Sequence, residues 1–259
     1  MLTIDRYLRP ASLEEAYQAA QQKNSAVLGG MLWLRLGHRR ITTAIDLSAL
    51  GLDTVEETPE GYRIGAYVSL RTLETHEGLN AAFGGAFRSA FSPIVGVQFR
   101  NLATVGGSVF GRFGFSDVVT LLLALGASVE LYRGGRVTLE EFCAMGRVRD
   151  ILTHIILPRR DVQIAFLAHR NAATDFPALN VCAVREGDTL RVTVGARPLR
   201  ACLYRYPLGD LAPEQIAEDI AAQAVLAANN RASEEYRRHL CRVLVRRAVR
   251  HALCGKEEL

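Results

Sequence analysis

The feature that most constrains the fold is a pair of adjacent glycines, which occurs twice in comparable surroundings. Leu28-Gly29-Gly30-Met31 follows a short apolar strand and precedes a helix start, and Thr104-Val105-Gly106-Gly107-Ser108 places the second pair between two hydroxyl side chains. Glycine lets backbone N–H groups approach a ligand closely, because no Cβ intervenes. Consecutive N–H groups in a turn, followed by a helix N-terminus, suit an anion such as a pyrophosphate. Either pair alone is more often a simple turn.

The spacing of these glycines excludes two common nucleotide-binding folds. Neither segment fits the dinucleotide fingerprint G-x-G-x-x-G or the phosphate loop G-x-x-x-x-G-K-[ST]. A Rossmann or P-loop assignment therefore has no support.

The first 50 residues alternate between strand and helix patterns. Ser12-Leu13-Glu14-Glu15 fits the S-x-x-E capping box and predicts a helix to about Gln22. Residues 25–28 and 43–47 read as short buried strands, with a second short helical stretch between them. This alternation predicts an α/β lobe.

The middle of the chain mixes hairpin and helix signals. Strands are expected at 54–57 and 62–65 around Pro59-Glu60-Gly61, and helices at 69–76 and 79–90. Residues 92–110 have no helical period and predict extended chain and turns that cross a core. Ser116 is a plausible N-cap for a further helix, and 127–132 alternates as a strand.

A boundary is expected near Pro158-Arg159-Arg160, with a second domain beyond it. Strands are predicted at 162–169, 178–185 and 189–196, the last two joined by a turn at Glu186-Gly187-Asp188. Helices are expected at 213–229 and 232–252. The last one carries apolar residues at helical spacing on one face and arginines on the other.

Composition limits the class of protein. The 259 residues suggest two domains, or one large and one small, and the share of 49% hydrophobic residues argues against long disorder. No apolar run reaches the roughly 20 residues of a membrane span, and the start lacks a signal peptide. The five cysteines have no C-x-x-C or zinc spacing, so no metal site is predicted. We therefore expect a cytoplasmic protein with reduced thiols.

The arginine-rich last helix leaves an alternative open. With a net charge of only +4 and no interleaved exposed aromatics, the chain does not predict a nucleic-acid binder. A basic face toward solvent or toward a partner subunit is the favoured interpretation. No Ser–His–Asp or Cys–His arrangement can be argued from spacing, so no catalytic acid–base residue is predicted in this chain.

Eight stretches of the chain carry a resemblance to a known family. They are Tyr7-Leu8-Arg9-Pro10-Ala11-Ser12-Leu13-Glu14-Glu15-Ala16, Leu28-Gly29-Gly30, Ala44-Ile45-Asp46-Leu47-Ser48, Arg100-Asn101-Leu102-Ala103-Thr104-Val105-Gly106-Gly107-Ser108, Ser116-Asp117-Val118-Val119, Leu122-Leu123-Ala124-Leu125-Gly126-Ala127, Tyr236-Arg237-Arg238-His239-Leu240 and Val245-Arg246-Arg247-Ala248. In order and content they resemble the FAD-binding (medium) subunit of the molybdenum hydroxylases, the xanthine dehydrogenase and carbon monoxide dehydrogenase medium-subunit family. The resemblance covers nearly the whole chain.

The resemblance implies a fold and a cofactor site. The fold is α/β (α+β): a two-lobed FAD-binding domain of the vanillyl-alcohol-oxidase-like (PCMH) type, then a C-terminal domain with a three-stranded antiparallel sheet and helices. The first domain is expected over 1–158, with lobes at about 1–52 and 53–158, and the second over 159–259. FAD is expected between the lobes, its pyrophosphate on both glycine loops. The implied contact residues are Val27, Leu28, Gly29, Gly30, Met31, Leu32, Trp33, Thr104, Val105, Gly106, Gly107, Ser108, Ser116 and Asp117.

The resemblance also implies a function. The subunit is expected to receive electrons from an iron–sulfur subunit, which takes them from a molybdopterin-binding subunit that hydroxylates the substrate. Reduced FAD would then serve NAD or another acceptor. Short members of the family often belong to xanthine or purine dehydrogenases. Asp117 is expected to accept hydrogen bonds from ribitol or ribose hydroxyls.

The sequence departs from the family pattern at several positions. The family often has Thr or Ser and then Asp where Met31-Leu32-Trp33 stands, and Asn where Ser108 stands. It often has Ser-Pro at Gly114-Phe115 and Lys at Ala168. Trp33 could stack on the cofactor or pack in a core. Two rival functions stay open: a flavin-free scaffold subunit, and a stand-alone flavin oxidase.

Overall fold

The computed structural model describes residues 1–209 and 212–254, which form two compact units of discontinuous chain. The first unit comprises Met1–Thr72, Gln98–Gly111 and Gly126–Arg159, and the second comprises Leu73–Val97, Arg112–Leu125 and Arg160–Leu259. One break between the units falls between Arg159 and Arg160, where the sequence places its boundary. The helices of 73–97 and 112–125, however, cluster with the C-terminal part. The mixed α/β class is as predicted.

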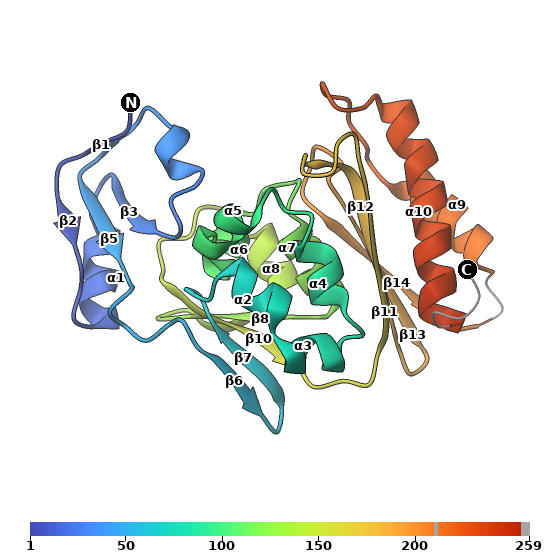
Figure 1. Ribbon diagram of the computed structural model, residues 1–259, viewed down its shortest axis with the longest axis horizontal. Helices are drawn as coiled ribbons and strands as arrows, with labels where there is room; N and C mark the ends of the chain where they lie inside the picture. Colours follow the sequence, from blue (N-terminus) through green and yellow to red (C-terminus); the bar gives the residue numbers. More distant parts are fainter. Residues whose placement is uncertain (210–211, 255–259) are drawn as a thin grey trace. The chain divides into compact units, whose positions relative to one another are not determined.

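The first unit begins with the predicted α/β lobe (Figure 1). Its elements are β1 (Thr3–Ile4), β2 (Tyr7–Leu8), α1 (Leu13–Gln21), β3 (Ser25–Leu28), the short 3-10 turn η1 (Leu34–Leu36), β4 (Arg40–Ile41) and β5 (Thr43–Asp46). Strands β2, β5 and β3 form a parallel sheet in that order. Ser12 caps α1, because its hydroxyl accepts from the Glu15 N–H at 3.2 Å. The Glu15 carboxylate accepts from Ala11 N, one residue earlier than the capping box predicts.

The rest of the first unit is built on a five-stranded antiparallel sheet in the order β6-β7-β10-β8-β9. Its elements are β6 (Val55–Thr58), β7 (Gly61–Gly65), β8 (Ser128–Leu131), β9 (Gly135–Thr138), α8 (Leu139–Ala144) and β10 (Leu152–Pro158). The β6–β7 hairpin confirms the turn signal at Pro59-Glu60-Gly61. Helix α2 (Leu70–Thr75) crosses from the first unit to the second.

The prediction of extended chain over 92–110 is wrong, because most of this segment is helical. It contains α5 (Val97–Leu102) and α6 (Val105–Gly111). The first N–H groups of α6 donate to the carbonyls of Val68 and Ala66 at 2.9 Å each. A Cβ on Gly106 would lie 2.6 Å from the Ala66 Cβ, so only glycine fits this contact. Tertiary packing thus imposes a helix on residues of poor helix propensity.

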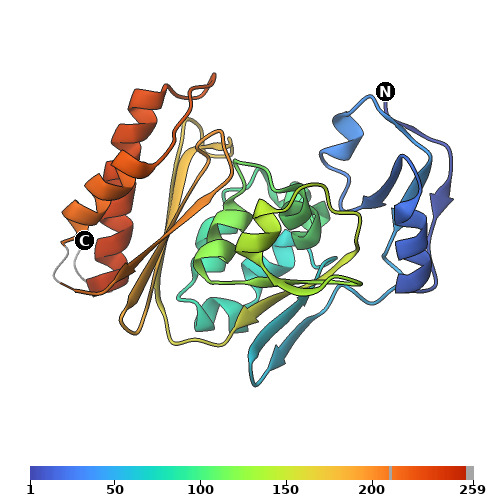
Figure 2. The same cartoon turned by 180° about the vertical axis from the view of Figure 1, so that it is seen from behind.

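The second unit is a sheet covered by helices on both faces. Its elements are α3 (Glu77–Ala82), α4 (Ala86–Phe91), α7 (Asp117–Ala124), β11 (Gln163–Arg170), β12 (Pro177–Glu186), β13 (Thr189–Gly195), β14 (Cys202–Pro207), α9 (Pro213–Gln223) and α10 (Glu234–Cys254). Helices α9 and α10 cover one face (Figures 1 and 2), where Val181, Val192 and Val245 join the core. Helices α4 and α7 contact the strands β11 to β13.

The C-terminal sheet has four antiparallel strands, not the expected three. Strand β14 was missed because it lies at the edge of the sheet, is only partly buried and ends in Pro207. The hairpin at Glu186-Gly187-Asp188 is confirmed, with Gly187 at φ 52°. Helix α9 ends at Gln223, earlier than predicted. Among the described residues, no helix is long and apolar enough to cross a membrane.

Candidate functional site

The first glycine segment links β3 to η1 as a turn of half-buried backbone. Met31 turns the chain here, with a φ of 57° in the left-handed region. Within residues 1–209 and 212–254, the N–H groups of Gly29, Gly30 and Met31 donate to no protein acceptor. A half-buried N–H group without an acceptor is costly unless water or a ligand supplies one. These three amides are therefore available as hydrogen-bond donors to a ligand.

The second segment does not present free backbone donors, contrary to the sequence expectation. The N–H groups of Val105 and Gly106 donate to Val68 O and Ala66 O. The Gly107 N–H donates to the Thr104 Oγ1 at 3.1 Å, and the Ser108 N–H donates to Thr104 O at 3.1 Å. These bonds form because the segment is the first turn of α6, whose leading amides need acceptors. Its contribution to the site is the fit of its backbone and the Thr104 hydroxyl.

The two segments lie directly against each other within the first unit. A Cβ on Gly29 would lie 2.9 Å from the Thr104 Oγ1 and 3.2 Å from the Gly107 Cα. A Cβ on Gly30 would lie 1.8 Å from the Leu102 carbonyl oxygen, which no neighbour could accommodate without moving. Glycine is therefore required at both positions by packing. The structure thus brings together two segments that are 75 residues apart in the sequence, counted from Gly29 to Thr104.

Tyr67, which was not predicted as a site residue, holds the turn at Gly29 through hydrogen bonds. The Tyr67 hydroxyl donates to the Leu28 carbonyl and accepts from the Leu47 N–H at 3.0 Å. Burial raises the pKa of this phenol, so the hydroxyl keeps the proton that it donates. Tyr67 thus ties the end of β3 to the end of β5, just before Gly29. Nothing in the local sequence pattern marks it.

The remaining residues of the first segment differ in exposure. Leu28 and Leu32 are buried, whereas Val27 and Trp33 are each 39% exposed. Trp33 therefore lies outside the core, which leaves it accessible to a cofactor. Its contact with a cofactor stays a prediction.

Ser116 and Asp117 belong to the second unit, where they begin α7. The Ser116 hydroxyl accepts from the Val119 N–H at 3.2 Å, as an N-cap should. Asp117 is only 5% exposed. Its carboxylate accepts from Arg170 at 2.8 Å and from the Asn180 amide at 2.7 Å.

These contacts give Asp117 an internal structural role. Burial raises the pKa of its carboxyl, while the Arg170 guanidinium and the Asn180 amide oppose that rise. Arg170 also donates to the Asp175 carbonyl, so the ion pair links α7 to the loop between β11 and β12. The expected contact between Asp117 and cofactor hydroxyls stays a prediction.

Comparison with known proteins places these features in context. A family model described as the FAD binding domain in molybdopterin dehydrogenase matches residues 2–160. The uncharacterized protein YgfM of Escherichia coli K12 is 26% identical over 260 residues, which cover 93% of this chain and 94% of that protein.

Solved structures share the fold over nearly the whole chain. Quinoline 2-oxidoreductase from Pseudomonas putida 86 matches with a TM-score of 0.83 and 18% identity, covering 98% of both chains. Reconstituted CO dehydrogenase from Oligotropha carboxidovorans matches with a TM-score of 0.82 and 21% identity, covering 98% of this chain and 99% of that one. CO dehydrogenase from Hydrogenophaga pseudoflava matches with a TM-score of 0.83 and 20% identity, covering 96% and 97%.

Proposed function

Because this chain belongs to the family of FAD-binding domains in molybdopterin dehydrogenases, we propose that it is the FAD-binding electron-transfer subunit of a molybdenum-containing hydroxylase. In this role it passes electrons from the iron–sulfur clusters of a partner subunit to NAD or another acceptor. The observation that carries the proposal is the turn with three free amides at Gly29, Gly30 and Met31. The cytoplasmic location expected from the sequence is part of the same proposal.

The residues present fit the pyrophosphate of FAD. Three neighbouring N–H groups can donate to an anion without first breaking a hydrogen bond to the protein, because none of them has a protein acceptor. The Thr104 hydroxyl adds a polar group beside Gly29, where a Cβ would otherwise fill the space. Tyr67 holds the turn in place through the Leu28 carbonyl. FAD, when bound, supplies the redox chemistry, and the protein positions it and excludes competing reactions.

The partners and the substrate are the finer parts of the proposal. A molybdopterin-binding subunit hydroxylates the substrate and an iron–sulfur subunit relays the electrons. A xanthine or purine dehydrogenase is the type that we propose, on the family resemblance of the sequence. The substrate does not contact this chain, so the chain needs no acid–base residue for its own step.

The first experiment is an absorption spectrum of the purified chain, followed by titration with FAD. We expect flavin absorption that saturates at one FAD per chain. The Gly29→Ala variant should bind FAD at least tenfold more weakly, because its Cβ would meet the Thr104 hydroxyl and displace the turn. Gly146→Ala is the matched control, since a Cβ there meets nothing within 4 Å.

Two results would contradict the proposal. A chain that binds no FAD, even at high concentration, is a scaffold subunit instead. A chain that oxidises a substrate on its own, and that purifies from its own cells without molybdenum or iron–sulfur partners, is a stand-alone flavin oxidase.

A further inference from the structure

Four loops of the second unit meet at one end of the β11–β14 sheet and form an open pocket of about 230 Å³. The pocket is lined by Phe115 from the loop before α7, Phe176 from the loop before β12, and Asn229 and Arg231 from the loop before α10. Ala196 and Pro198 close it after β13. None of the residues that line the pocket is among the cofactor contacts proposed above, although Phe115 directly precedes Ser116.

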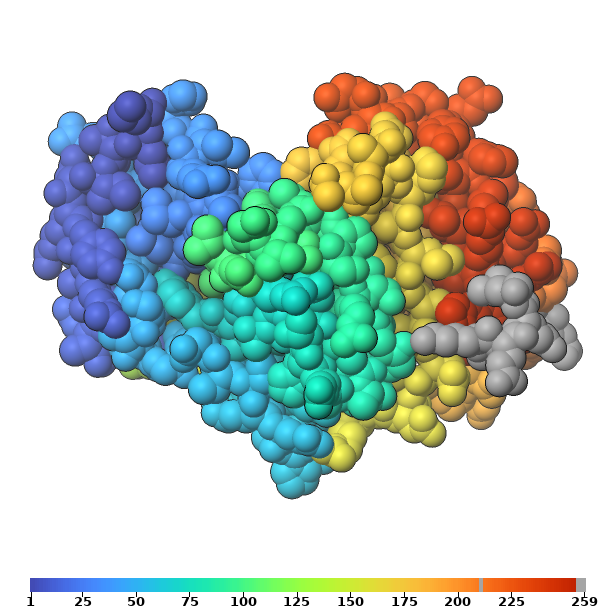
Figure 3. Space-filling view, in the orientation of Figure 1, coloured from blue at the N-terminus to red at the C-terminus, as the bar shows by residue number. Residues whose placement is uncertain are grey.

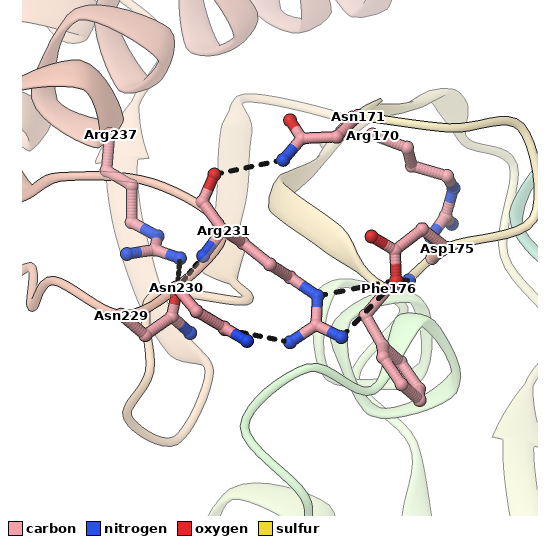
Figure 4. Close-up of polar contacts among 8 residues, drawn as sticks. All are labelled: Arg170, Asn171, Asp175, Phe176, Asn229, Asn230, Arg231 and Arg237. Atoms are coloured by element: carbon pink, nitrogen blue, oxygen red, sulfur yellow. Dashed lines mark hydrogen bonds and ion pairs between the residues drawn. The ribbon is translucent and has the colours of Figure 1, made fainter.

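One wall of the pocket is an aromatic ladder that continues to the surface. The Phe115 and Phe176 rings have centroids 4.4 Å apart. Phe113 stacks on Phe115 at 5.2 Å with an interplanar angle of 9°, and is itself 40% exposed. The Arg231 guanidinium lies 4.9 Å from the centroid of Phe176, a cation–π contact (Figure 4).

The arginine side of the pocket is held by a hydrogen-bond network. Arg231 contacts the Asp175 carboxylate at 3.3 Å, its N–H donates to the Asn229 Oδ1 at 3.0 Å, and its carbonyl accepts from Asn171 at 3.0 Å (Figure 4). Figure 3 shows the same neighbourhood from outside, where the yellow surface of the β11–β12 loop adjoins the red surface before α10. The loops are thus fixed relative to each other within this unit.

A buried arginine anchors this network. Arg237 is fully buried and donates to the carbonyls of Ala178, Ala227 and Ala232 and to the Asn229 Oδ1. Within the part of the chain that the structure describes, no carboxylate pairs with it. Arg237 therefore adds a second positive charge close to that of Arg231.

The loops around the pocket together carry a net positive charge. The segments 112–115, 175–177, 196–200 and 229–231 contain four arginines and one aspartate, namely Arg112, Arg197, Arg200, Arg231 and Asp175. An excess of positive charge on one small surface favours an acidic ligand or partner.

Exposed apolar side chains extend the surface beyond the pocket. Phe113, Leu199 and Val225 are 40%, 42% and 65% exposed. They adjoin the pocket, because a Cβ on Gly114 would lie 2.6 Å from the Leu199 carbonyl and Arg197 donates to the Val225 carbonyl. Exposed apolar side chains beside an excess of charged ones are typical of a protein–protein interface.

We propose that this pocket, together with the exposed side chains of Phe113, Leu199 and Val225, forms a docking surface for an acidic segment of a partner protein chain. An apolar side chain of the partner packs on the Phe113–Phe115–Phe176 ladder, and a carboxylate of the same segment faces Arg231. A small ligand would fill the pocket but leave Leu199 and Val225 exposed. A single-stranded nucleic acid requires exposed rings for base stacking, whereas Leu199 and Val225 are aliphatic.

Site-specific photocrosslinking tests this proposal. The tagged full chain is expressed in its own cells with the photoreactive residue p-benzoylphenylalanine in place of Phe113 or, separately, of Val225. The matched control carries it in place of Tyr236, which is 40% exposed on α10. We expect positions 113 and 225 to crosslink to the same partner chain, within a peptide that has an excess of Asp and Glu. Position 236 should give no such adduct.

A charge reversal and a salt series complete the test. Arg231→Glu should lower the crosslink yield at position 225 at least tenfold, and Arg231→Lys should restore most of it. The yield should also fall at high ionic strength, because salt screens exposed charges. Circular dichroism and FAD binding of the same variants separate this inference from misfolding and from the proposed FAD site.

Three outcomes overturn the proposal: no protein adduct at positions 113 and 225, an adduct whose peptide has no acidic excess, or a yield that Arg231→Glu leaves unchanged in a folded chain.

Discussion

Gly30 and Gly107 have different neighbours. Substitutions at the two positions should therefore distinguish an effect on packing from an effect on ligand binding. A Cβ at position 30 would lie 1.8 Å from a backbone carbonyl, that of Leu102. A Cβ at position 107 would meet only the Thr104 hydroxyl at 2.9 Å and the Gly29 Cα at 3.6 Å. Backbone cannot move as cheaply as a side-chain hydroxyl, so the two substitutions should have different consequences.

We predict that Gly30→Ala destabilises the first unit by about 2 kcal/mol or more, because the turn must move away from α5. Gly107→Ala should leave stability within about 1 kcal/mol, since alanine also favours the helix at this exposed position. Both variants should lose FAD affinity. Urea unfolding and FAD titration measure the two effects independently. Equal stabilities of the two variants would contradict the packing argument.

Tyr67 provides a second test at the scale of single residues. We predict that Tyr67→Phe costs about 1–3 kcal/mol, because the Leu28 carbonyl and the Leu47 N–H lose their shared partner in a part-buried place. FAD affinity should fall several-fold as the turn loosens. Tyr7→Phe is a suitable comparison, since the exposed Tyr7 hydroxyl donates to the Asp46 carboxylate, to which the Tyr67 hydroxyl also lies close, at 3.4 Å. Equal losses of FAD affinity in both variants would rule out a positioning role for Tyr67.

Single residues also show how far the sequence predicts this site. Both glycine pairs could be located, because few other residues allow so close a backbone approach. The sequence could not show which amides are free, at Gly29 to Met31, and which are bonded within the protein, in α6. Hydrogen-bond partners depend on chain segments that are distant in sequence. Tyr67 was missed for the same reason: its partners lie 39 and 20 residues away.

Individual elements agree with the sequence predictions where they depend only on residues close by in the chain. Ser116 caps α7 and the β12–β13 hairpin turns at Gly187, because a hydroxyl cap and a glycine with φ near 52° act through their own neighbours. Helix α6 and strand β14 were missed, since packing on Ala66 and pairing with β13 determine them.

The antiparallel pairing of β7, β10 and β8 places His154 beside an arginine and a glutamate. The His154 Nδ1 lies 2.9 Å from an Arg63 nitrogen and 3.3 Å from the Glu130 carboxylate. Burial lowers the pKa of this imidazole, Arg63 lowers it further, and Glu130 and Glu56 oppose the shift. The folded state therefore binds the proton more weakly than the unfolded state.

This shift predicts a pH dependence of stability. The contribution of neutral His154 is fully present above the ordinary histidine pKa of about 6.5 and is lost as pH falls through the lower folded-state pKa. From about pH 7.5 to about pH 5, the wild type should lose more stability than His154→Gln. The check is the difference between the urea midpoints of the two proteins at each pH. A parallel pH dependence would show that His154 does not contribute.

Helix α10 carries arginines of two kinds, contrary to the expectation of a single basic face. Arg237 is buried and donates hydrogen bonds to three carbonyls, whereas Arg242 is exposed and forms an ion pair with Glu218 on α9 at 2.8 Å. We predict that Arg237→Met costs about 3 kcal/mol, since buried acceptors lose their donors. Arg242→Met should cost less than about 1 kcal/mol, as exposed ion pairs do. Chemical unfolding checks both, and similar losses would contradict the burial argument.

The whole molecule consists of two units that each draw on three separate stretches of chain. The sequence indicated one boundary, at the residues after Pro158, because a change from helix–strand alternation to successive strands is visible there. It did not indicate that 73–97 and 112–125 join the C-terminal part. Their helices are apolar, as Phe87, Leu121 and Leu122 illustrate, and an apolar helix pattern does not specify which sheet it covers.

Two units with separate cores should give separable unfolding transitions, and this predicts where FAD acts. A ligand that binds only the folded state raises stability by about 2.7 kcal/mol at a hundred times its Kd. We expect calorimetry to show that saturating FAD raises the transition that Gly30→Ala lowers, since both act on the turn of the first unit. If FAD instead raised only the transition that Arg237→Met lowers, the cofactor would be held by the second unit and the assignment to the glycine segments would be wrong.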